Sequence, residues 1–521
     1  MQPRAAPAAP ATPVVTMSRV ESFVLQGIEA IPCEIEIDLC TRGLSGTTMV
    51  GLPDAAVRES LDRVKTAIHN NGYRYPWRRA TISLAPGDLR KEGPVFDLPI
   101  AIGLLAADGA IDGRGLALDQ AIIAGELALD GRLRPVRGAT SVAILAKRRG
   151  KRAVLLPSAN AAEAAAVDGI EVHGFDRLPE VVGFLNGLAR SEPTPTVEAD
   201  AMLGSAHAEI DFGEIRGQES AKRALAIAAA GSHNVLLLGP AGSGKTMMAR
   251  ALPGLLPPMS RDEALEVTRI HSCAGLLSGG RSLVCARPVR SPHHTASTAA
   301  IVGGGRVPRP GEVSLAHRGV LFLDELPEFA RPVLESLREP LEDGVVTFAR
   351  AHGATSFPAR VLLVAAMNPT HRGNRVEGER GRVEQDRYLS RLSGPLVDRI
   401  DLHVEVSAVP FDQLAAKRRG SDTASLRAKV LAAREVAARR QGEGVANAAL
   451  KGRDLDRLAA LDAGSLRLLG EAMESLGLSA RAYDKIRRIA RTIADLEGAE
   501  TIVVEHVAEA ISYRLLDRAN E

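Results

Sequence analysis

A glycine-rich loop ahead of a predicted helix has the residue types and spacing of a phosphate-binding site. It consists of Gly239, Pro240, Ala241, Gly242, Ser243, Gly244, Lys245 and Thr246. The glycines let successive backbone N–H groups converge on phosphate oxygens at a helix N-terminus, where the helix dipole favours negative charge. Lys245 is expected to reach the β- and γ-phosphates, and Thr246 to ligate Mg²⁺ through its hydroxyl. The loop therefore predicts binding of a nucleoside triphosphate with magnesium.

A pair of acidic residues further along the chain supplies the second half of this chemistry. Asp324 and Glu325 directly follow the apolar residues 320–323, which predict a buried strand. Asp324 is expected to hold the same magnesium ion as Thr246, directly or through water. Glu325 is then placed to orient and deprotonate the attacking water. Together the two motifs predict hydrolysis of the triphosphate.

Such a loop needs a strand before it and a helix after it, and the flanking sequence predicts both. Residues 234–238 are strand-like, residues 247–252 predict a helix, and residues 361–367 predict another strand. Residues 211–407 are therefore expected to form an α/β domain with a mainly parallel sheet and helices on both faces. Residues 408–521 predict a small all-helical domain, with helices at 425–441, 454–461, 465–476, 480–496 and 503–516.

The region ahead of the phosphate-binding loop predicts a separate α/β domain over residues 17–188. Its strands are expected at 33–39, 81–85, 122–127 and 153–156, and its helices at 54–70 and 98–107. Residues 1–16 are an Ala/Pro tail that is expected to be disordered. Residues 189–210, with prolines among polar residues, predict a linker.

Composition narrows the classes of partner. The 521 residues include 65 Lys and Arg against 63 Asp and Glu, so contact with nucleic acid has to come from local patches. Aromatic residues make up only 3%, with one Trp, which argues against a broad base-stacking platform. No apolar stretch approaches the ~20 residues of a membrane span. Cys33 and Cys40 lie an odd number of residues apart on a predicted strand and cannot bridge, so reduced thiols and a cytoplasmic location are expected.

Several further motifs carry a resemblance to a known family. They are Ser-Pro-His-His-Thr at 291–295, Gly-Gly-Gly at 303–305, Pro-Gly-Glu-Val-Ser-Leu-Ala-His at 310–317, Asp-Glu-Leu-Pro-Glu-Phe at 324–329, Ala-Ala-Met-Asn-Pro at 365–369 and Arg-Leu-Ser-Gly-Pro-Leu-Val-Asp-Arg-Ile-Asp at 391–401. The chain resembles AAA+ ATPases, and more closely the magnesium-chelatase-like family that includes ComM and YifB. The resemblance covers nearly the whole chain after Met17, and it implies ATP as the nucleotide.

The resemblance also assigns roles and partners. It implies that Asn368 is sensor 1, that Arg481 is sensor 2 in a C-terminal helical lid, and that Arg399 is the arginine finger, with Arg391 as its competitor. A finger supplied to a neighbouring subunit implies a homo-oligomeric ring, and the family expectation is a hexamer. The same resemblance implies a motor that acts on single-stranded or branched DNA, by branch migration or as a helicase, in natural transformation and recombination.

Alternatives remain open at this point. The chain could be a magnesium-chelatase ATPase subunit that remodels a protein partner, although such subunits lack the first domain. It could instead be a nucleotide-dependent scaffold or chaperone. For either arginine alone, a surface salt bridge is the alternative to a finger.

The first domain resembles the Lon-protease fold, but the residues needed for proteolysis are replaced. Val95 occupies the position of the nucleophile and Thr140 that of the lysine base, so no peptidase activity is expected. The basic residues Arg78, Arg79, Arg90 and Lys91 could form a DNA-facing surface or simply a solvated basic face.

Two other segments have open interpretations. Residues 370–391 lack the cysteines that relatives carry after the Asn-Pro, so zinc is not predicted; their arginines could touch phosphates in a pore or belong to a mobile charged loop. His293 and His294 have no acidic neighbour in the sequence, and adjacent side chains diverge on a strand or helix. A backbone or DNA-facing role in an inserted loop is therefore expected for them rather than metal binding.

Overall fold

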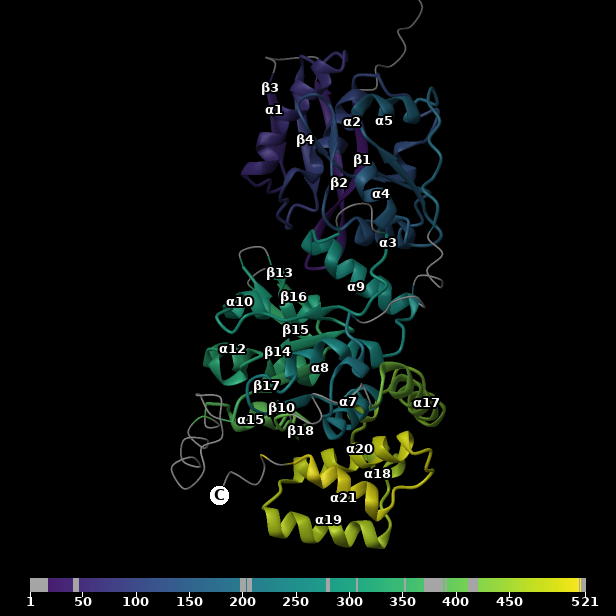
Figure 1. Ribbon diagram of the computed structural model, residues 1–521. Helices are drawn as coiled ribbons and strands as arrows, with labels where there is room; N and C mark the ends of the chain where they lie inside the picture. The colour runs from purple at the N-terminus through teal and green to yellow at the C-terminus, as the bar shows by residue number, and fades with distance from the viewer. Residues whose placement is uncertain are drawn as a thin grey trace, which may run out of the picture. The chain divides into compact units, whose positions relative to one another are not determined.

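The computed structural model describes residues 17–40, 46–196, 203, 209–277, 282–305, 308–350, 353–369, 388, 391–410, 420–514 and 516. The chain divides into two compact units (Figure 1). Unit 1 comprises Met1–Ala199 with Leu265–Val284, and unit 2 comprises Asp200–Ala264 with Cys285–Glu521. The predicted tail at 1–16, and most of the linker and of the 370–391 loop, lie outside the described residues.

Unit 1 is built on a mixed seven-stranded sheet with the order β3-β4-β2-β1-β5-β8-β9. The strands are β1 (Met17–Gln26), β2 (Glu29–Cys40), β3 (Gly46–Val50), β4 (Arg79–Ala85), β5 (Ala121–Ile123), β8 (Ala153–Pro157) and β9 (Glu171–Phe175), and a small ribbon is formed by β6 (Glu126–Leu127) and β7 (Leu133–Arg134). Strands β1, β2 and β4 are antiparallel neighbours, whereas β1-β5-β8-β9 run parallel. The expected strand at 122–127 is wrong in extent, because the chain leaves the sheet after Ile123 and the Gly125 N–H donates to the Val95 carbonyl.

Helices cover both faces of this sheet because successive strand residues alternate between two apolar clusters. The helices are α1 (Ala55–Asn70), α2 (Asp97–Ala107), α3 (Ala139–Arg148), α4 (Ser158–Ala164) and α5 (Leu178–Leu185). Ile123 and Leu155 pack in the cluster that contains α1, α2 and α5. Ile122 and Val154 pack in the one that contains α3 and α4.

The segment Leu265–Val284 belongs to unit 1 although the sequence places it inside the predicted ATPase domain. It includes most of helix α9 (Arg261–Ala274). Within unit 1, Arg269 Nη2 lies 2.5 Å from a Glu29 carboxylate oxygen, and Arg269 Nε donates to Ser141 Oγ at 3.3 Å. Cys273 is buried with its Sγ 3.6 Å from the same hydroxyl. An ion pair and buried polar contacts therefore fix this segment.

Unit 2 contains a five-stranded sheet with the order β11-β14-β17-β10-β18, and every pairing in it is parallel. The strands are β10 (Val235–Leu238), β11 (Val289–Arg290), β14 (Val320–Leu323), β17 (Leu362–Met367) and β18 (Leu402–Glu405). Two ribbons accompany it, formed by β12 (Gly303–Gly304) with β13 (Arg309–Pro310) and by β15 (Val345–Arg350) with β16 (Gly353–Pro358). The parallel sheet predicted for this region is confirmed.

The remaining helices surround that sheet and continue to the C-terminus. They are α7 (Glu219–Gly231), α8 (Lys245–Ala251), α10 (Thr298–Ile301), α11 (Glu312–Leu315), α12 (Arg331–Ser336), α13 (Arg338–Asp343), α15 (Gly394–Val397), α17 (Thr423–Gln441), α18 (Gly452–Leu458), α19 (Ala463–Leu476), α20 (Ala480–Leu496) and α21 (Val504–Ser512). Among the helices that the structure describes, none is both long and apolar enough to cross a membrane.

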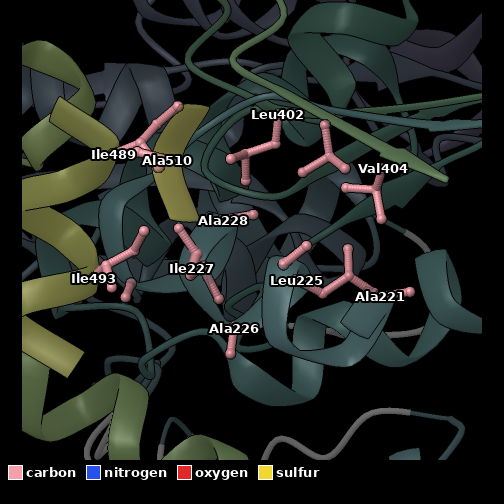
Figure 2. Close-up of a cluster of buried hydrophobic side chains, with 14 of the residues drawn as sticks. Ala221, Leu225, Ala226, Ile227, Ala228, Leu402, Val404, Ile489, Ile493 and Ala510 are labelled. Carbon is pink, nitrogen blue, oxygen red and sulfur yellow. The ribbon is translucent and has the colours of Figure 1, made fainter. Parts of the chain in front are cut away.

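The C-terminal helices share one core with the sheet of unit 2. Figure 2 shows Leu225 and Ile227 of α7 together with Leu402 of β18 and with Ile489 and Ile493 of α20. All five side chains are fully buried. Burial of each such residue stabilises the fold by about 1.5–3 kcal/mol, so the helical region is held against the sheet by the hydrophobic effect.

Candidate functional site

The phosphate-binding loop joins the carboxyl end of β10 to the first residue of α8. A Cβ atom at Gly239 would lie 2.1 Å from the Val406 carbonyl oxygen, so only glycine allows this approach. Gly242 and Gly244 have φ values of 76° and 93°, in the left-handed region that favours glycine. The loop therefore adopts a compact turn whose backbone opens toward the N-terminus of α8.

Lys245 points its ammonium group back into the loop. Its Nζ donates to the carbonyl oxygens of Gly239 at 2.7 Å and Pro240 at 2.8 Å, and to Asn368 Oδ1 at 3.2 Å. Burial lowers the pKa of Lys245, and the charge of Asp324 counteracts this shift. The ammonium is thus surrounded by oxygen acceptors, and phosphate oxygens are the ligand atoms that could replace them.

Thr246 and Asp324 provide a pair of oxygen ligands beside this ammonium. Thr246 Oγ1 lies 3.2 Å from Asp324 Oδ2. Hydroxyl and carboxylate oxygens are the hard ligands that Mg²⁺ prefers, and the ion keeps several waters when few protein ligands are present. The residues present therefore fit magnesium, which Thr246 and Asp324 would hold and which would neutralise negative charge on the triphosphate.

The parallel sheet explains why these residues meet. The loop follows β10, Asp324 follows β14 and Asn368 follows β17. In the register of the sheet, Leu238 pairs with Met367 and Leu323 pairs with Ala365. Because parallel strands end at the same edge, their following residues lie together, which is where ligands bind in open α/β sheets.

Glu325 lies at the same edge in a constrained backbone conformation. Its φ is 53° and its N–H donates to Asp324 Oδ1 at 2.9 Å. Its half-exposed carboxylate is 3.1 Å from His294 Nδ1. A left-handed conformation is unusual for a non-glycine residue and is typical of functional sites. The neighbouring histidine can fix the direction in which the Glu325 carboxylate points.

The structure corrects the expectation for the two histidines. Their side chains do not diverge: the rings lie 4.1 Å apart at 32°. The His294 ring also meets Phe329 edge-on at 6.4 Å. The alternation rule fails because both residues follow β11 in a segment that is neither strand nor helix. Since β11 pairs with β14, the residues after the two strands meet at one edge, and Glu325 is the acidic partner that sequence proximity did not reveal.

Replacing His294 by alanine is expected to lower ATP turnover on the order of tenfold while leaving the affinity for ATP unchanged. The reason is that Glu325 loses the group that orients its carboxylate, and a general base is effective only in the right geometry. Steady-state ATPase assays together with calorimetric ATP titrations provide the measurement. The exposed His69 of unit 1 supplies a control, His69→Ala. Unchanged turnover in His294→Ala would show that this contact plays no part in hydrolysis.

Gln218 is a loop contact that the sequence did not reveal. Its side chain donates to the Ser243 carbonyl at 3.3 Å and to the Ser407 carbonyl at 2.6 Å, and its own φ is 60°. It lies just ahead of α7, far from the loop in sequence. It thereby holds the phosphate-binding loop to the chain that follows β18.

Arg399 lies at the opposite edge of the sheet from Lys245. Its carbonyl accepts from Asn234 Nδ2 at 3.0 Å, and Asn234 directly precedes β10. Lys245 follows the other end of that strand. The four residues of β10 span roughly 13 Å. The structure therefore does not bring Arg399 to the phosphate-binding loop of its own chain.

Arg481 is found beside Arg399. Both line a surface cavity of about 540 Å³, together with Asp398 and Glu342. Arg481 Nη1 lies 3.2 Å from Asp398 Oδ2, and its side chain is 69% exposed. Arg399 forms an ion pair with Glu342, and this bond lowers the Glu342 pKa. Two of the predicted site arginines thus share one surface.

Arg391, the competing finger, has a different environment. Its guanidinium lies 3.0 Å from both carboxylate oxygens of Glu328 and 5.5 Å from the Tyr388 ring centroid. A carboxylate and an aromatic face therefore hold this arginine next to the segment that follows Glu325. The alternative that Arg391 is the arginine finger stays a prediction.

In unit 1, one predicted surface residue is misplaced. Lys91 is fully buried, and its ammonium donates to the Pro86 and Leu89 carbonyls, so it cannot face DNA. Thr140 is buried with Oγ1 3.3 Å from the Glu163 carbonyl, and Val95 packs against the apolar core. The absence of peptidase activity and the Lon-like fold stay predictions that rest on residue identity.

Replacing Lys245 by alanine is expected to weaken ATP binding at least a hundredfold. Charge-assisted hydrogen bonds to a phosphate are among the stronger polar contacts, and removing the buried ammonium also leaves acceptor oxygens facing the phosphates. Calorimetric titration of the variant with ATP and magnesium measures the loss. Arg250→Ala, in the last turn of α8, serves as the matched cation control. Wild-type affinity in Lys245→Ala would exclude this loop as the nucleotide site.

Comparison with known proteins identifies the family of this chain. Family profiles described as "Magnesium chelatase, subunit ChlI", "Subunit ChlI of Mg-chelatase" and "Magnesium chelatase, subunit ChlI C-terminal" match residues 211–414, 35–160 and 420–514. Competence protein ComM of Haemophilus influenzae is 45% identical over 97% of this chain and 98% of its own length. YifB of Escherichia coli is 43% identical over the same shares.

A more distant relative matches part of the chain. The magnesium-chelatase 38 kDa subunit of Cereibacter sphaeroides is 27% identical over 58% of this chain and 91% of its own length. The identity to the full-length relatives is much higher and spans both units. The chain therefore belongs to the magnesium-chelatase-like family of AAA+-type ATPases that includes ComM and YifB.

Proposed function

We propose that this protein is a cytoplasmic, ATP-driven ring motor that acts on DNA, with branch migration of recombining strands as its activity. The ATPase part follows from membership of the family. The observation that carries the proposal is the division of charged residues between the two edges of one parallel sheet. Lys245, Thr246 and Asp324 gather at the carboxyl edge, whereas Arg399 and Arg481 lie toward the amino edge.

At the carboxyl edge, each side chain has a separate task in hydrolysis. Lys245 and the loop amides bind the triphosphate, and Thr246 with Asp324 would hold magnesium. Asn368, which already accepts from Lys245, is suited to position the γ-phosphate or the attacking water. Glu325 accepts the proton from that water while His294 keeps its carboxylate in place.

At the other edge, the arginines are suited to the nucleotide of a neighbouring copy. Among the described residues, Lys245 is the cation that contacts the phosphate-binding loop. An arginine supplied by a neighbouring copy would add charge that stabilises the transition state, and such a heterologous contact gives a ring where the rotation between copies closes. Lys485 of α20 lies 3.3 Å from Asp401, close to Arg399 in the chain. Movement of the C-terminal helices on ATP binding would therefore move the arginine surface as well.

The DNA part of the proposal is supported by relatedness. The Haemophilus influenzae relative carries the name of a competence protein. The chelatase reading is the second candidate, and it is favoured by the chelatase subunit of Cereibacter sphaeroides. The match to that subunit covers only 58% of this chain, whereas the match to the ComM relative covers 97%. The difference in coverage favours the DNA motor.

The test is an ATPase and strand-exchange experiment on the full chain. Purified protein is given forked or three-stranded DNA with ATP and magnesium, and both phosphate release and displacement of a labelled strand are followed. Stimulation of hydrolysis by DNA, with strand displacement that Lys245→Ala abolishes, is the expected result. Rapid ATP hydrolysis that no DNA substrate stimulates would instead favour a chelatase-type subunit or a scaffold.

A further inference from the structure

A stretch of unit 1 combines aromatic and basic residues without any acidic residue. Between Arg63 and Gly87 the sequence contains no Asp or Glu, and its centre reads Tyr-Arg-Tyr-Pro-Trp-Arg-Arg at 73–79. Residues 73–78 of this centre lie in the loop between α1 and β4, and Arg79 is the first residue of β4 (Figure 1). Alternating aromatic and basic side chains are typical of surfaces that bind single-stranded nucleic acid.

Trp77 is the unusual member of this loop. Its side chain is 64% exposed, although large aromatic residues normally bury most of their surface. Lys65 of α1 places its ammonium 4.4 Å from the indole centroid, and the Tyr75 ring meets the indole edge-on at 5.7 Å. The Tyr75 hydroxyl is in turn 3.2 Å from Thr47 Oγ1 of β3. The indole is therefore held in place by its neighbours and still presents most of its surface to solvent.

Four cations belong to the same stretch of chain as Trp77. Lys65, Arg74 and Arg79 are exposed and Arg78 is partly so, and none of the four makes an ion pair with another described residue. By contrast, Arg63 on the same helix pairs with the buried Asp97 at 2.9 Å. Unpaired cations beside a fixed aromatic ring complement a ligand that carries both phosphate charges and planar bases.

We propose that Trp77 is a stacking site for an unpaired base of single-stranded DNA, with Lys65, Arg74, Arg78 and Arg79 along the path of the phosphates. The identity of the strand as DNA rests on the function proposed above. Duplex DNA does not offer the face of a base, because its bases stack on each other. An apolar protein partner would not need four cations without ion pairs among the described residues in this stretch of chain. The low aromatic content excludes a broad platform but not a site for one base.

The indole itself provides the measurement, since the chain contains a single tryptophan. An oligothymidylate is titrated into the full-length protein at low salt, and tryptophan emission is recorded together with anisotropy of a labelled strand. Saturable quenching that follows binding is expected. An abasic oligonucleotide of the same length should bind by charge alone and leave the emission nearly unchanged. Equal quenching by both strands, or binding without any quenching, would overturn the stacking site.

Two variants and a control complete the test. Trp77→Ala is expected to weaken binding of the oligothymidylate about tenfold, and Trp77→Phe to recover part of the loss. Arg74→Ala should lower the slope of log affinity against log salt by about one. Leu188→Ala, at an exposed apolar residue of the same unit, should bind normally. Circular dichroism confirms that each variant is folded.

The outcomes separate this inference from the proposed function. DNA that stimulates ATP hydrolysis equally in wild type and Trp77→Ala, with unchanged affinity, overturns the stacking site and leaves the motor intact. Emission that changes with protein concentration, and not with DNA, identifies the loop as an interface between copies and also overturns it. Protein that neither binds nor responds to DNA overturns both.

Discussion

Replacing Glu325 by glutamine should reduce ATP hydrolysis by at least about a hundredfold while ATP stays bound. Glutamine has the shape of glutamate but cannot take a proton from the attacking water. The Lys245 contacts and the Thr246–Asp324 pair are left intact, so the triphosphate and magnesium are still held. Steady-state phosphate release and retention of labelled ATP on the protein measure the two effects.

The control for this substitution is Glu335→Gln. Glu335 lies on α12 and pairs with Arg338 at 2.9 Å, so the variant removes a carboxylate of the same unit without touching the site. It should hydrolyse ATP at the wild-type rate. Wild-type turnover in Glu325→Gln would remove Glu325 from the mechanism. Weaker ATP binding in the variant would show that Glu325 contributes to binding of ATP rather than to the hydrolysis step.

Arg399→Ala should lower turnover about a thousandfold, since an arginine that meets the γ-phosphate in the transition state is worth 10³–10⁵ in related NTPases. Arg399 lies at the amino edge of the sheet, away from the phosphate-binding loop of its own chain, so its effect can be tested by mixing subunits. A subunit that carries Arg399→Ala keeps its own phosphate-binding loop, and a Lys245→Ala subunit keeps its arginine. Mixing the two inactive variants should therefore restore part of the ATPase activity at mixed interfaces.

Arg391→Ala provides the comparison, because Arg391 is the rival for the finger and is already paired with Glu328. The effect of Arg391→Ala on turnover should be much smaller than that of Arg399→Ala. A thousandfold loss of turnover in Arg391→Ala, with Arg399→Ala still active, would show that Arg391 and not Arg399 is the finger. Failure of the mixed subunits to regain activity would contradict a finger supplied by the neighbour.

Much of the nucleotide site can be predicted from local sequence patterns. The glycine spacing of residues 239–246 and the apolar run before Asp324 each depend on short stretches of chain, and the strands that position them lie where the patterns predict. A local pattern likewise predicts the helix at 54–70, and in the structure the Asp54 side chain caps its first turn by accepting from the Val57 N–H.

Features that depend on tertiary structure could not be predicted. The pairing of His294 with Glu325 follows from β11 and β14 being neighbours, which no local pattern encodes. The contact of Gln218 with the phosphate-binding loop, and the assignment of Leu265–Val284 to unit 1, likewise require the folded chain. Lys91 looked like a surface cation because charge is usually exposed, but nearby carbonyl oxygens solvate it internally.

The most direct test of the central claim is a calorimetric titration of ATP with magnesium into the folded, full-length protein. Saturable binding that Lys245→Ala abolishes and Arg250→Ala preserves is the predicted result, because the ammonium and the loop amides form the phosphate site. Folded wild-type protein that releases or absorbs no heat of binding at any ATP concentration would contradict the account.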